Sequence, residues 1–286
     1  MRIVTFLGPD GPRPGVLSGD DRVVDLSAIA PTVSSLIEAG PAAWDAARVL
    51  ATAGDAVQLG RLLAPLRPSS LRDFLAFEDH AKGGARRRNE ELNPAWYETP
   101  VYYKGNHRSV IGPDADVPWP SFTEKLDFEL ELGCVLGALA IDLDESEAAS
   151  AIFGYTVMND WSARDVQRSE MAMRLGPSKS KDFATSLGPC IVTADEFDPS
   201  SPNGMIARVN GQVWCEASTA DMHWTFPRMI AHVSRGESVW PADVYGSGTP
   251  FGGCGLDLDR WIRPDDVVEL EIAGIGVLRN RVVRDR

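Results

Sequence analysis

Apolar and polar residues alternate over much of this chain, and the alternation predicts a protein rich in β-strands. Successive side chains of a strand point to opposite faces, so an apolar residue at every second position indicates a strand with one buried face. Beyond residue 70 we expect strands at 102–105, 127–137, 152–160, 190–194, 205–214, 267–276 and 277–283. Asn210-Gly211 suits a type I′ turn and predicts a hairpin within 205–214. The helix candidates in this part are 145–152 and 226–236.

The first 66 residues have a different pattern and predict a small α/β unit. Two strand-like segments, 1–8 and 22–27, are separated by glycine, proline and aspartate turns, and residues 32–66 are rich in alanine and leucine at helical spacing. Pro68 and its neighbouring serines then predict a linker. We therefore expect an N-terminal domain over 1–66 and a β-rich domain over 70–286. This is an α+β arrangement rather than the strand–helix alternation of a doubly wound sheet.

Composition and charge exclude several classes of function. The 286 residues carry a formal net charge of −13, which argues against a nucleic-acid partner. No apolar run approaches the roughly 18 residues of a membrane span, and the N-terminal segment has no apolar signal region. The four cysteines are widely spaced and predict reduced, mostly buried thiols. We therefore expect a cytoplasmic protein without membrane contact.

Three carboxylates occupy alternate positions in DFELEL, residues 127–132. In a strand, Asp127, Glu129 and Glu131 would share one face while the apolar residues between them cover the core. Like charges placed side by side cost stability unless something positive lies among them. The stretch therefore predicts either a solvated acidic face or part of a cation site.

Two further stretches concentrate polar residues. MNDWSARDVQ, residues 158–167, follows an apolar strand and places Asp160 and Arg164 at its end, where functional sites are common. Alternatively, this stretch begins a helix that is capped by Asn159 or Asp160. LGPSKSKDFATSLGP, residues 175–189, carries two lysines between two Gly-Pro pairs and on its own predicts a flexible surface loop.

Together these three stretches resemble the fumarylacetoacetate hydrolase family of metal-dependent enzymes. Further matching segments are RDFLAFEDHA, PVYYKGN, VYGSGTPFGGCG and DDVVELEIAGIGVLRNRV, so the resemblance extends from about residue 70 to the C-terminus. It implies a catalytic domain over 70–286 with a mixed β-sandwich or roll, and a small N-terminal domain such as many members carry. It also implies that the protein is an enzyme and a homodimer.

The resemblance further implies a divalent cation, usually magnesium and sometimes manganese or calcium. Glu129, Glu131 and Asp160 match the carboxylate ligands of the family, and Asp73 matches a fourth ligand found in some members. Carboxylate oxygens suit these hard cations and disfavour zinc or copper. Asp127 matches no ligand of the family, and we expect it to be a neighbouring polar residue.

The same match assigns roles around the metal. Four positions align with substrate-binding residues of the family: Arg164, Gln167, Tyr103 and Thr249. Lys181 aligns with a lysine that balances negative charge on the substrate, and Lys179 is its rival two residues away. His80 aligns with a catalytic base on a mobile segment over the site. Both Glu78 and Asp257 could be its carboxylate partner; we include Glu78 in the catalytic set and leave Asp257 as the open alternative.

The reaction implied is hydrolysis of a C–C bond in a 2,4-diketo acid, an acylpyruvate or fumarylpyruvate-like compound, through a metal-stabilised enolate. The same chemistry would serve an oxaloacetate decarboxylase or a hydroxydienoate isomerase, and a non-catalytic keto-acid-binding member is a further alternative. Leu75 and Met171 stand where some members carry tyrosine. Met171, Met173 and Trp161 predict either an apolar distal pocket, and with it a substrate with a less polar tail, or ordinary core positions.

Overall fold

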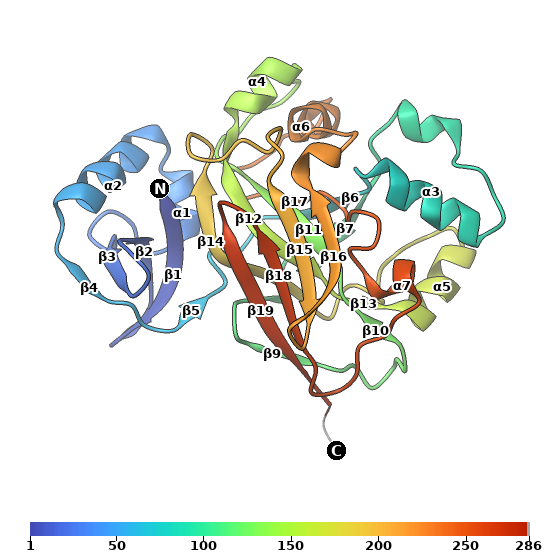
Figure 1. Cartoon of the computed structure of the whole chain (residues 1–286). Coiled ribbons are helices and arrows are strands. Elements are labelled where there is room, and N and C mark those ends of the chain that lie inside the picture. The colour runs from blue at the N-terminus through green and yellow to red at the C-terminus, as the bar shows by residue number, and fades with distance from the viewer. Residues whose placement is uncertain (285–286) are drawn as a thin grey trace.

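Two β-sheets form the body of the protein in the computed structural model, which describes residues 1–284 (Figure 1). The larger sheet has the order β4-β3-β2-β1-β14-β12-β11-β17-β6-β7, with β5 paired to β1 and β8 to β14. Its strands are β1 (Arg2–Gly8), β2 (Gly11–Leu17), β3 (Arg22–Asp25), β4 (Ala56–Gln58), β5 (Leu62–Leu63), β6 (Leu71–Phe74), β7 (Tyr102–Gly105), β8 (Val110–Ile111), β11 (Leu130–Leu136), β12 (Ile152–Asp160), β14 (Thr185–Thr193) and β17 (Val244–Gly246).

The smaller sheet packs against the larger one and closes the core. Its order is β16-β15-β18-β19-β9, with strands β9 (Asp116–Pro118), β15 (Gly204–Val209), β16 (Gln212–Ser218), β18 (Val267–Ile272) and β19 (Gly276–Val283). Leu270 and Leu278 of this sheet share one buried apolar cluster with Tyr155 and Val157 of β12. Side chains from the inner faces of both sheets therefore form the core of a sandwich, which confirms the predicted β-rich α+β fold.

The predicted hairpin lies at the edge of the smaller sheet. Val209 of β15 pairs with Gln212 of β16, and Asn210 and Gly211 between them have φ angles of 51° and 76°. Positive φ at both central residues is the requirement of a type I′ turn, which asparagine and glycine meet at little cost.

The strands of the first 66 residues belong to the larger sheet. β1 pairs with β14 through Ile3 and Ile191, so this segment extends the sheet of the main part. The helical prediction for 32–66 is right for α1 (Val33–Glu38) and α2 (Pro41–Ala53) and wrong beyond Gly54. Gly54 has extended backbone angles, and the chain continues into β4 and β5, which pair with β3 and β1. The division into two domains at 66–70 stays a prediction.

The continuous strand predicted over 127–137 is interrupted. Leu126–Asp127 forms β10, which pairs with β13 (Ser162–Ala163), and β11 begins only at Leu130. The Asp127 carboxylate accepts hydrogen bonds from the backbone nitrogens of Phe128 and Gly255, and these bonds redirect the chain between the two strands. Asp127 and Glu129 therefore belong to different ladders.

The helices lie around the sheets on several sides (Figure 1). The two predicted helices are confirmed as α4 (Glu145–Ser150) and α6 (Phe226–Ser234). A helix was the alternative for 158–167, and α5 (Arg164–Ala172) begins within that stretch. The helices that were not predicted are α3 (Glu78–Arg87), α7 (Gly255–Leu258) and the 3₁₀ helices η1 (Pro94–Tyr97) and η2 (Thr219–Asp221). α3, α5 and α7 lie near one another beside the sheets (Figure 1). Asn159 and Asp160 end β12 instead of capping a helix. The predicted loop 175–189 becomes a strand from Thr185 onward.

Within the described residues 1–284, no helix combines the length and the apolar character needed to cross a membrane.

Candidate metal centre and active site

Four carboxylates meet in one buried cluster at the end of the larger sheet. Asp73 lies on β6, Glu131 on β11 and Asp160 at the end of β12, and Glu129 directly precedes β11. One oxygen of each lies within 4.8 Å of one oxygen of every other member. The most exposed of the four, Glu129, is only 6% exposed. The structure thus brings together all four positions predicted as metal ligands, and we call them the carboxylate cluster.

The residues of this cluster fit a divalent cation. A Cβ atom added at Gly246 of β17 would lie 2.5 Å from Glu131 Oε2 and 2.6 Å from Asp73 Oδ1, so only glycine leaves room for the carboxylates there. Among the described residues, Glu131 Oε1 and Asp160 Oδ1 are buried without a hydrogen-bond partner. Buried acceptors are rarely left unpaired, and an all-oxygen donor set suits magnesium, manganese or calcium. A bound cation would give both oxygens a partner.

The cluster carries more negative charge than its protein neighbours balance. Burial and the neighbouring carboxylates raise the pKa of Asp73 and of Glu131 well above the usual range. Burial also raises the pKa of Asp160, although the nearby Lys181 ammonium opposes the effect. For Glu129 burial acts in the same direction, but the charges of Lys181 and Arg164 and the hydrogen bond from Lys181 together outweigh it and lower the pKa. The excess negative charge is the electrostatic reason to expect a cation here.

Lys181, and not its rival Lys179, reaches the carboxylate cluster. Its Nζ lies 2.6 Å from Glu129 Oε2 and also donates to Asp160. The surrounding carboxylates raise the pKa of Lys181 although burial opposes this, so the side chain stays charged. Lys179 is exposed, with its Nζ 5.0 Å from the centre of the Phe122 ring.

Glu170 of α5 holds the loop that carries this lysine. Its carboxylate accepts hydrogen bonds from the backbone nitrogen of Ser178 at 3.0 Å and from the hydroxyl of Ser180 at 2.6 Å. It also accepts from the Ser178 hydroxyl and the Ser180 nitrogen. Lys181 directly follows this anchored segment. In the sequence Glu170 resembles any solvated helix glutamate, so no signal identified it.

Arg164 lies beside the carboxylate cluster, and Gln167 contacts Arg164. Both lie in the first turn of α5, three residues apart, and therefore on one face of the helix. Arg164 Nη2 lies 2.8 Å from Glu129 Oε1, and Arg164 Nη1 donates to Gln167 Oε1 at 2.9 Å. Tyr103 of β7 donates its hydroxyl to Asp160 Oδ2 at 2.7 Å.

Asp127 is more than the neighbouring polar residue expected from the sequence. Its fully buried carboxylate accepts from Arg164 Nε at 2.8 Å and from the backbone nitrogens of Gly255 at 2.8 Å and Leu256 at 3.0 Å. Charge-assisted hydrogen bonds of this kind fix an arginine firmly. Asp127 thus orients Arg164 and ties it to the start of α7.

His80 of α3 pairs with Asp257 of α7. Its Nδ1 lies 2.7 Å from Asp257 Oδ2, and the same oxygen accepts from the backbone nitrogen of Gly252 at 2.9 Å. Arg87 donates to the other carboxylate oxygen at 2.7 Å. Burial alone would raise the pKa of Asp257, but hydrogen bonding and the charges of His80 and Arg87 lower it below the ordinary value. Asp257 is therefore ionised at neutral pH.

Glu78, which we included in the catalytic set, does not pair with His80. Its carboxylate accepts from the Tyr97 hydroxyl at 2.6 Å and contacts Lys82 Nζ at 2.5 Å. Residues two apart on a helix lie about 200° around its axis, so Glu78 points away from His80. This correction assigns the position beside His80 to Asp257, the alternative that the sequence left open.

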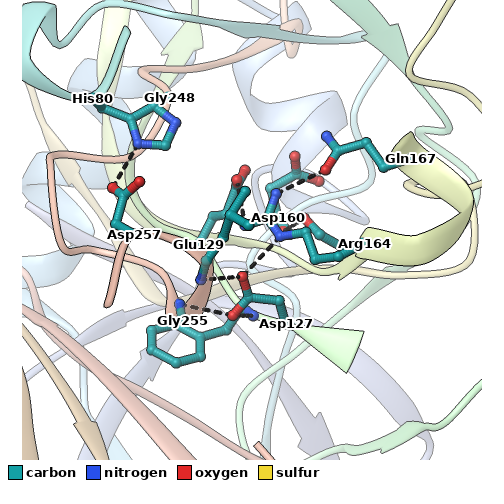
Figure 2. Close-up of polar contacts among 12 residues, drawn as sticks. His80, Asp127, Glu129, Asp160, Arg164, Gln167, Gly248, Gly255 and Asp257 are labelled. Carbon is teal, nitrogen blue, oxygen red and sulfur yellow. Dashed lines mark hydrogen bonds and ion pairs between the residues drawn. The ribbon is translucent and has the colours of Figure 1, made fainter. Parts of the chain in front are cut away.

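The His80–Asp257 pair and the Arg164–Gln167 pair flank the carboxylates Glu129 and Asp160 (Figure 2). On one side lies His80 with Asp257, and on the other Arg164 with Gln167. A backbone bridge between Glu129 and Cys254 connects the carboxylate cluster to the segment that leads into α7. The arrangement can hold a cation, orient an acidic substrate and accept a proton within one site.

Thr249 completes the surroundings of the cluster. It follows Gly248, whose backbone nitrogen donates to Asp73 Oδ1 and Glu131 Oε2, both at 3.2 Å. The Thr249 side chain is buried, and its hydroxyl has no hydrogen-bond partner within residues 1–284. A buried hydroxyl beside a polar site is available to a ligand.

The residues predicted to line an apolar distal pocket differ in their exposure. Trp161 is fully buried and donates from Nε1 to Ser186 Oγ at 2.8 Å, so it belongs to the core and not to a pocket lining. Met171 and Met173 are 51% and 73% exposed at the end of α5, and Leu75 packs against the core.

The fold and site define a class of protein: a β-sandwich with a buried carboxylate cluster suited to a divalent cation and a histidine–aspartate pair beside it. The family model described as fumarylacetoacetate (FAA) hydrolase C-terminal matches residues 70–283, and the chain belongs to this family.

Relatives within the family have names that imply different reactions. The human mitochondrial oxaloacetate tautomerase FAHD2A is 31% identical over 297 residues, which cover 99% of this chain and 92% of the relative. The structure of fumarylacetoacetate hydrolase from psychrophilic Exiguobacterium antarcticum matches with a TM-score of 0.83 at 28% identity over 100% of both chains. That of 5-carboxymethyl-2-hydroxymuconate delta-isomerase from Mycobacterium smegmatis matches with a TM-score of 0.75, also at 28% identity over 100% of both chains. Family members are enzymes, but membership alone leaves the reaction open.

Proposed function

We propose that the protein is a divalent-metal-dependent hydrolase that cleaves a C–C bond of a 2,4-diketo acid of the acylpyruvate class. The observation that carries this proposal is the His80–Asp257 pair beside the buried carboxylate cluster. Magnesium is the proposed cation, with manganese or calcium as alternatives, held by Glu129, Glu131 and Asp160 with Asp73 as a fourth ligand. A cytoplasmic homodimer remains our expectation.

The cation would supply Lewis acidity toward the two oxygens of a chelating keto acid. The protein groups around it would bind and orient the rest of the substrate. Arg164, held by Asp127 and Gln167, presents a fixed cation to the keto-acid end. The unpaired hydroxyl of Thr249 is available to a substrate carboxylate.

His80 would act as the general base. A carboxylate only accepts hydrogen bonds, so Asp257 favours the neutral imidazole tautomer with its proton on Nδ1 and leaves Nε2 as the acceptor. Nε2 would remove a proton from water, and the resulting hydroxide would add to the distal carbonyl carbon. The C–C bond then breaks, its electron pair forming the enolate of a pyruvate-like acid. Lys181 would balance that charge, and the proton taken by His80 would return to the enolate carbon.

Turnover of acylpyruvates in the presence of magnesium tests this proposal. We expect Glu129→Gln to lose activity at least about 100-fold because it removes a charged ligand. We expect His80→Ala to lose hydrolysis by about 100-fold or more. Glu91→Gln and His107→Ala, which alter residues outside the carboxylate cluster, are the matched controls. Wild-type turnover by Glu129→Gln would contradict the metal assignment, and wild-type hydrolysis by His80→Ala would contradict the base.

An oxaloacetate decarboxylase or tautomerase, or a hydroxydienoate isomerase, is the second candidate. The full-length similarity to a relative named oxaloacetate tautomerase favours it. These reactions need the same enolate chemistry but no attacking water. Assays of wild type and His80→Ala with oxaloacetate therefore separate the two: decarboxylation or tautomerisation without any diketo-acid hydrolysis by wild type would favour the second candidate.

A further inference from the structure

Helix α3 holds Asp257 at both of its carboxylate oxygens. His80 Nδ1 lies 2.7 Å from Oδ2, and an Arg87 terminal nitrogen donates to Oδ1 at 2.7 Å. Seven residues separate His80 from Arg87, which is nearly two helical turns, so both side chains lie on one face of α3. The Asp257 side chain is fully buried, whereas that of Arg87 is 33% exposed.

The buried contacts of α3 are made by small residues, and at its first residue Glu78 accepts a hydrogen bond from Tyr97. Its buried positions are Ala81, Gly83 and Ala85. A Cβ atom added at Gly83 would lie only 3.0 Å from the Phe251 ring, so the helix approaches the 249–253 loop closely there. Because these side chains offer little apolar area, we expect the orientation of α3 over the site to depend on its polar contacts, of which the two to Asp257 lie beyond the bond at Glu78 toward the C-terminal end of the helix.

Only one of the three consecutive arginines of this segment makes this contact. Successive helical residues point about 100° apart, which directs Arg87 toward α7 and its neighbours elsewhere. Arg88 pairs with Glu90 at 2.9 Å. Arg86 is exposed and forms no ion pair within residues 1–284. Arg86 is therefore a matched control for Arg87 in charge, size and helix.

We propose that Arg87 is a positioning residue that acts on His80 through Asp257. By occupying Oδ1, it fixes the carboxylate so that Oδ2 faces His80 Nδ1. Asp257 then holds the imidazole in one orientation, with Nδ1 toward the carboxylate and Nε2 turned away from it. The geometric part of this inference stands on the contacts of α3 and α7, and its catalytic consequence rests on the proposed function.

Two other roles would make different predictions. If Arg87 bound the substrate itself, its removal would raise KM and would act independently of Asp257. If the Arg87–Asp257 pair served stability alone, its removal would lower the melting temperature and leave the histidine ring unaffected in the folded protein. The tests below separate these roles from positioning.

The first test observes the histidine ring without any reaction. NMR of the full-length protein with ¹⁵N-labelled histidine identifies the His80 signals by their absence from His80→Ala, and reports the tautomer and the exchange of the Nδ1 proton. We expect a protected Nδ1 proton in wild type and in Arg86→Ala, and a rapidly exchanging one or mixed tautomers in Arg87→Ala. A ring signal unchanged in folded Arg87→Ala would overturn the proposal.

The second test is kinetic and uses the magnesium-loaded enzyme with an acylpyruvate. We expect Arg87→Ala to lower kcat by about 10- to 100-fold with KM within about twofold of wild type, since misplacing a catalytic group costs rate more than binding. Arg87→Lys should recover part of the loss, added guanidinium ion should partly rescue Arg87→Ala, and Arg86→Ala should match wild type. A loss confined to KM would refute positioning.

A double-mutant cycle with Asp257→Asn completes the design. If Arg87 acts through Asp257, adding Arg87→Ala to Asp257→Asn should change kcat by no more than about twofold, and fully additive losses would contradict the proposal. Should Arg87→Ala fail to fold, Arg87→Lys and Arg87→Gln provide the same comparison. If wild type hydrolyses no diketo acid, the proposed function fails, whereas the NMR result still decides whether Arg87 positions His80.

Discussion

Replacement of Glu131 by glutamine removes one charge from the carboxylate cluster with almost no change in side-chain volume. Glu131 is fully buried, and burial together with the charges of Asp73 and Asp160 raises its pKa well above the usual range. An ionised Glu131 therefore costs folding free energy in the metal-free protein. We expect Glu131→Gln to be more stable than wild type in EDTA and to lose most of the stabilisation that magnesium gives.

Two estimates bound the gain in stability. One oxygen of each carboxylate lies within 4.8 Å of one oxygen of the others, and two unit charges at that distance repel by about 3 kcal/mol at an effective dielectric constant of about 20. The free-energy cost of burying an ionised Glu131 cannot exceed the cost of protonating it instead. Keeping a glutamate neutral at pH 7 costs about 3 to 4 kcal/mol, at roughly 1.4 kcal/mol per pH unit. Since Lys181 offsets part of the repulsion, we expect a gain of about 1 to 3 kcal/mol. For a chain of this size that corresponds to a rise in Tm of about 2 to 5 °C.

The dependence on pH gives the sign of the effect. The folded-state pKa of Glu131 is above its unfolded value, so the penalty is absent below about pH 4 and grows as pH rises through the unfolded pKa toward the folded one. Thermal unfolding followed by circular dichroism at pH 4 and pH 7, in EDTA and in magnesium, measures the pH-dependent penalty and the stabilisation by magnesium. Exposed Glu91→Gln is the control. A variant less stable than wild type in EDTA at pH 7, with an unchanged response to magnesium, would refute the reasoning.

Four further predictions follow from the same site. Gly246→Ala should lower magnesium affinity at least about 10-fold by calorimetry, because a Cβ there would lie within 2.6 Å of two carboxylate oxygens. Glu170→Gln should lower kcat about 10-fold in steady-state assays, because the loop before Lys181 loses its charged acceptor. Asp127→Asn should raise KM for the keto acid about 10-fold, because it weakens the charged bond that holds Arg164. Magnesium binding should release protons and weaken as pH falls, because the raised pKa values in the cluster let protons compete with the metal; calorimetry in buffers of different ionisation enthalpy measures the release.

Each of these predictions has a result that contradicts it. Wild-type magnesium affinity in Gly246→Ala would show that the carboxylates do not need the space. A wild-type kcat in Glu170→Gln would show that the function of Lys181 does not depend on the hydrogen bonds of Glu170. An unchanged KM in Asp127→Asn would mean that Arg164 keeps its orientation without the charge of Asp127. A heat of magnesium binding that is the same in every buffer would exclude proton competition. Glu91→Gln serves as the control for each substitution.

Local pattern predicted those parts of the fold that local forces determine. The hairpin at 205–214 follows from Asn210-Gly211 and the alternation around it. The start of α4 follows from Asp144, whose side chain caps the helix together with Glu147. The break between β10 and β11 could not be found this way, because two of the groups that bind Asp127, on Arg164 and Gly255, come from distant parts of the chain.

The same distinction applies to the site. Alternation and the family resemblance together placed Glu129, Glu131 and Asp160, and the structure gathers them in one cluster. The partner of His80 could not be chosen, since Glu78 is close in sequence but lies on another face of the helix, while Asp257 arrives from 177 residues away. Contacts between residues that are far apart in the sequence leave no periodic pattern in it.

The pairing of β1 with β14 affects how the protein can be divided. The family match begins at residue 70, but a fragment that begins there would lack β1 and expose the edge of β14 at Ile191 and Val192. An unprotected strand edge with apolar neighbours invites pairing between molecules and aggregation. The start of the family-model match is therefore a poor place to truncate this chain, and β14 also carries Thr185 and Ser186, close after Lys181. Exchange of N-terminal segments between relatives would have to preserve the β1–β14 register to keep that edge covered.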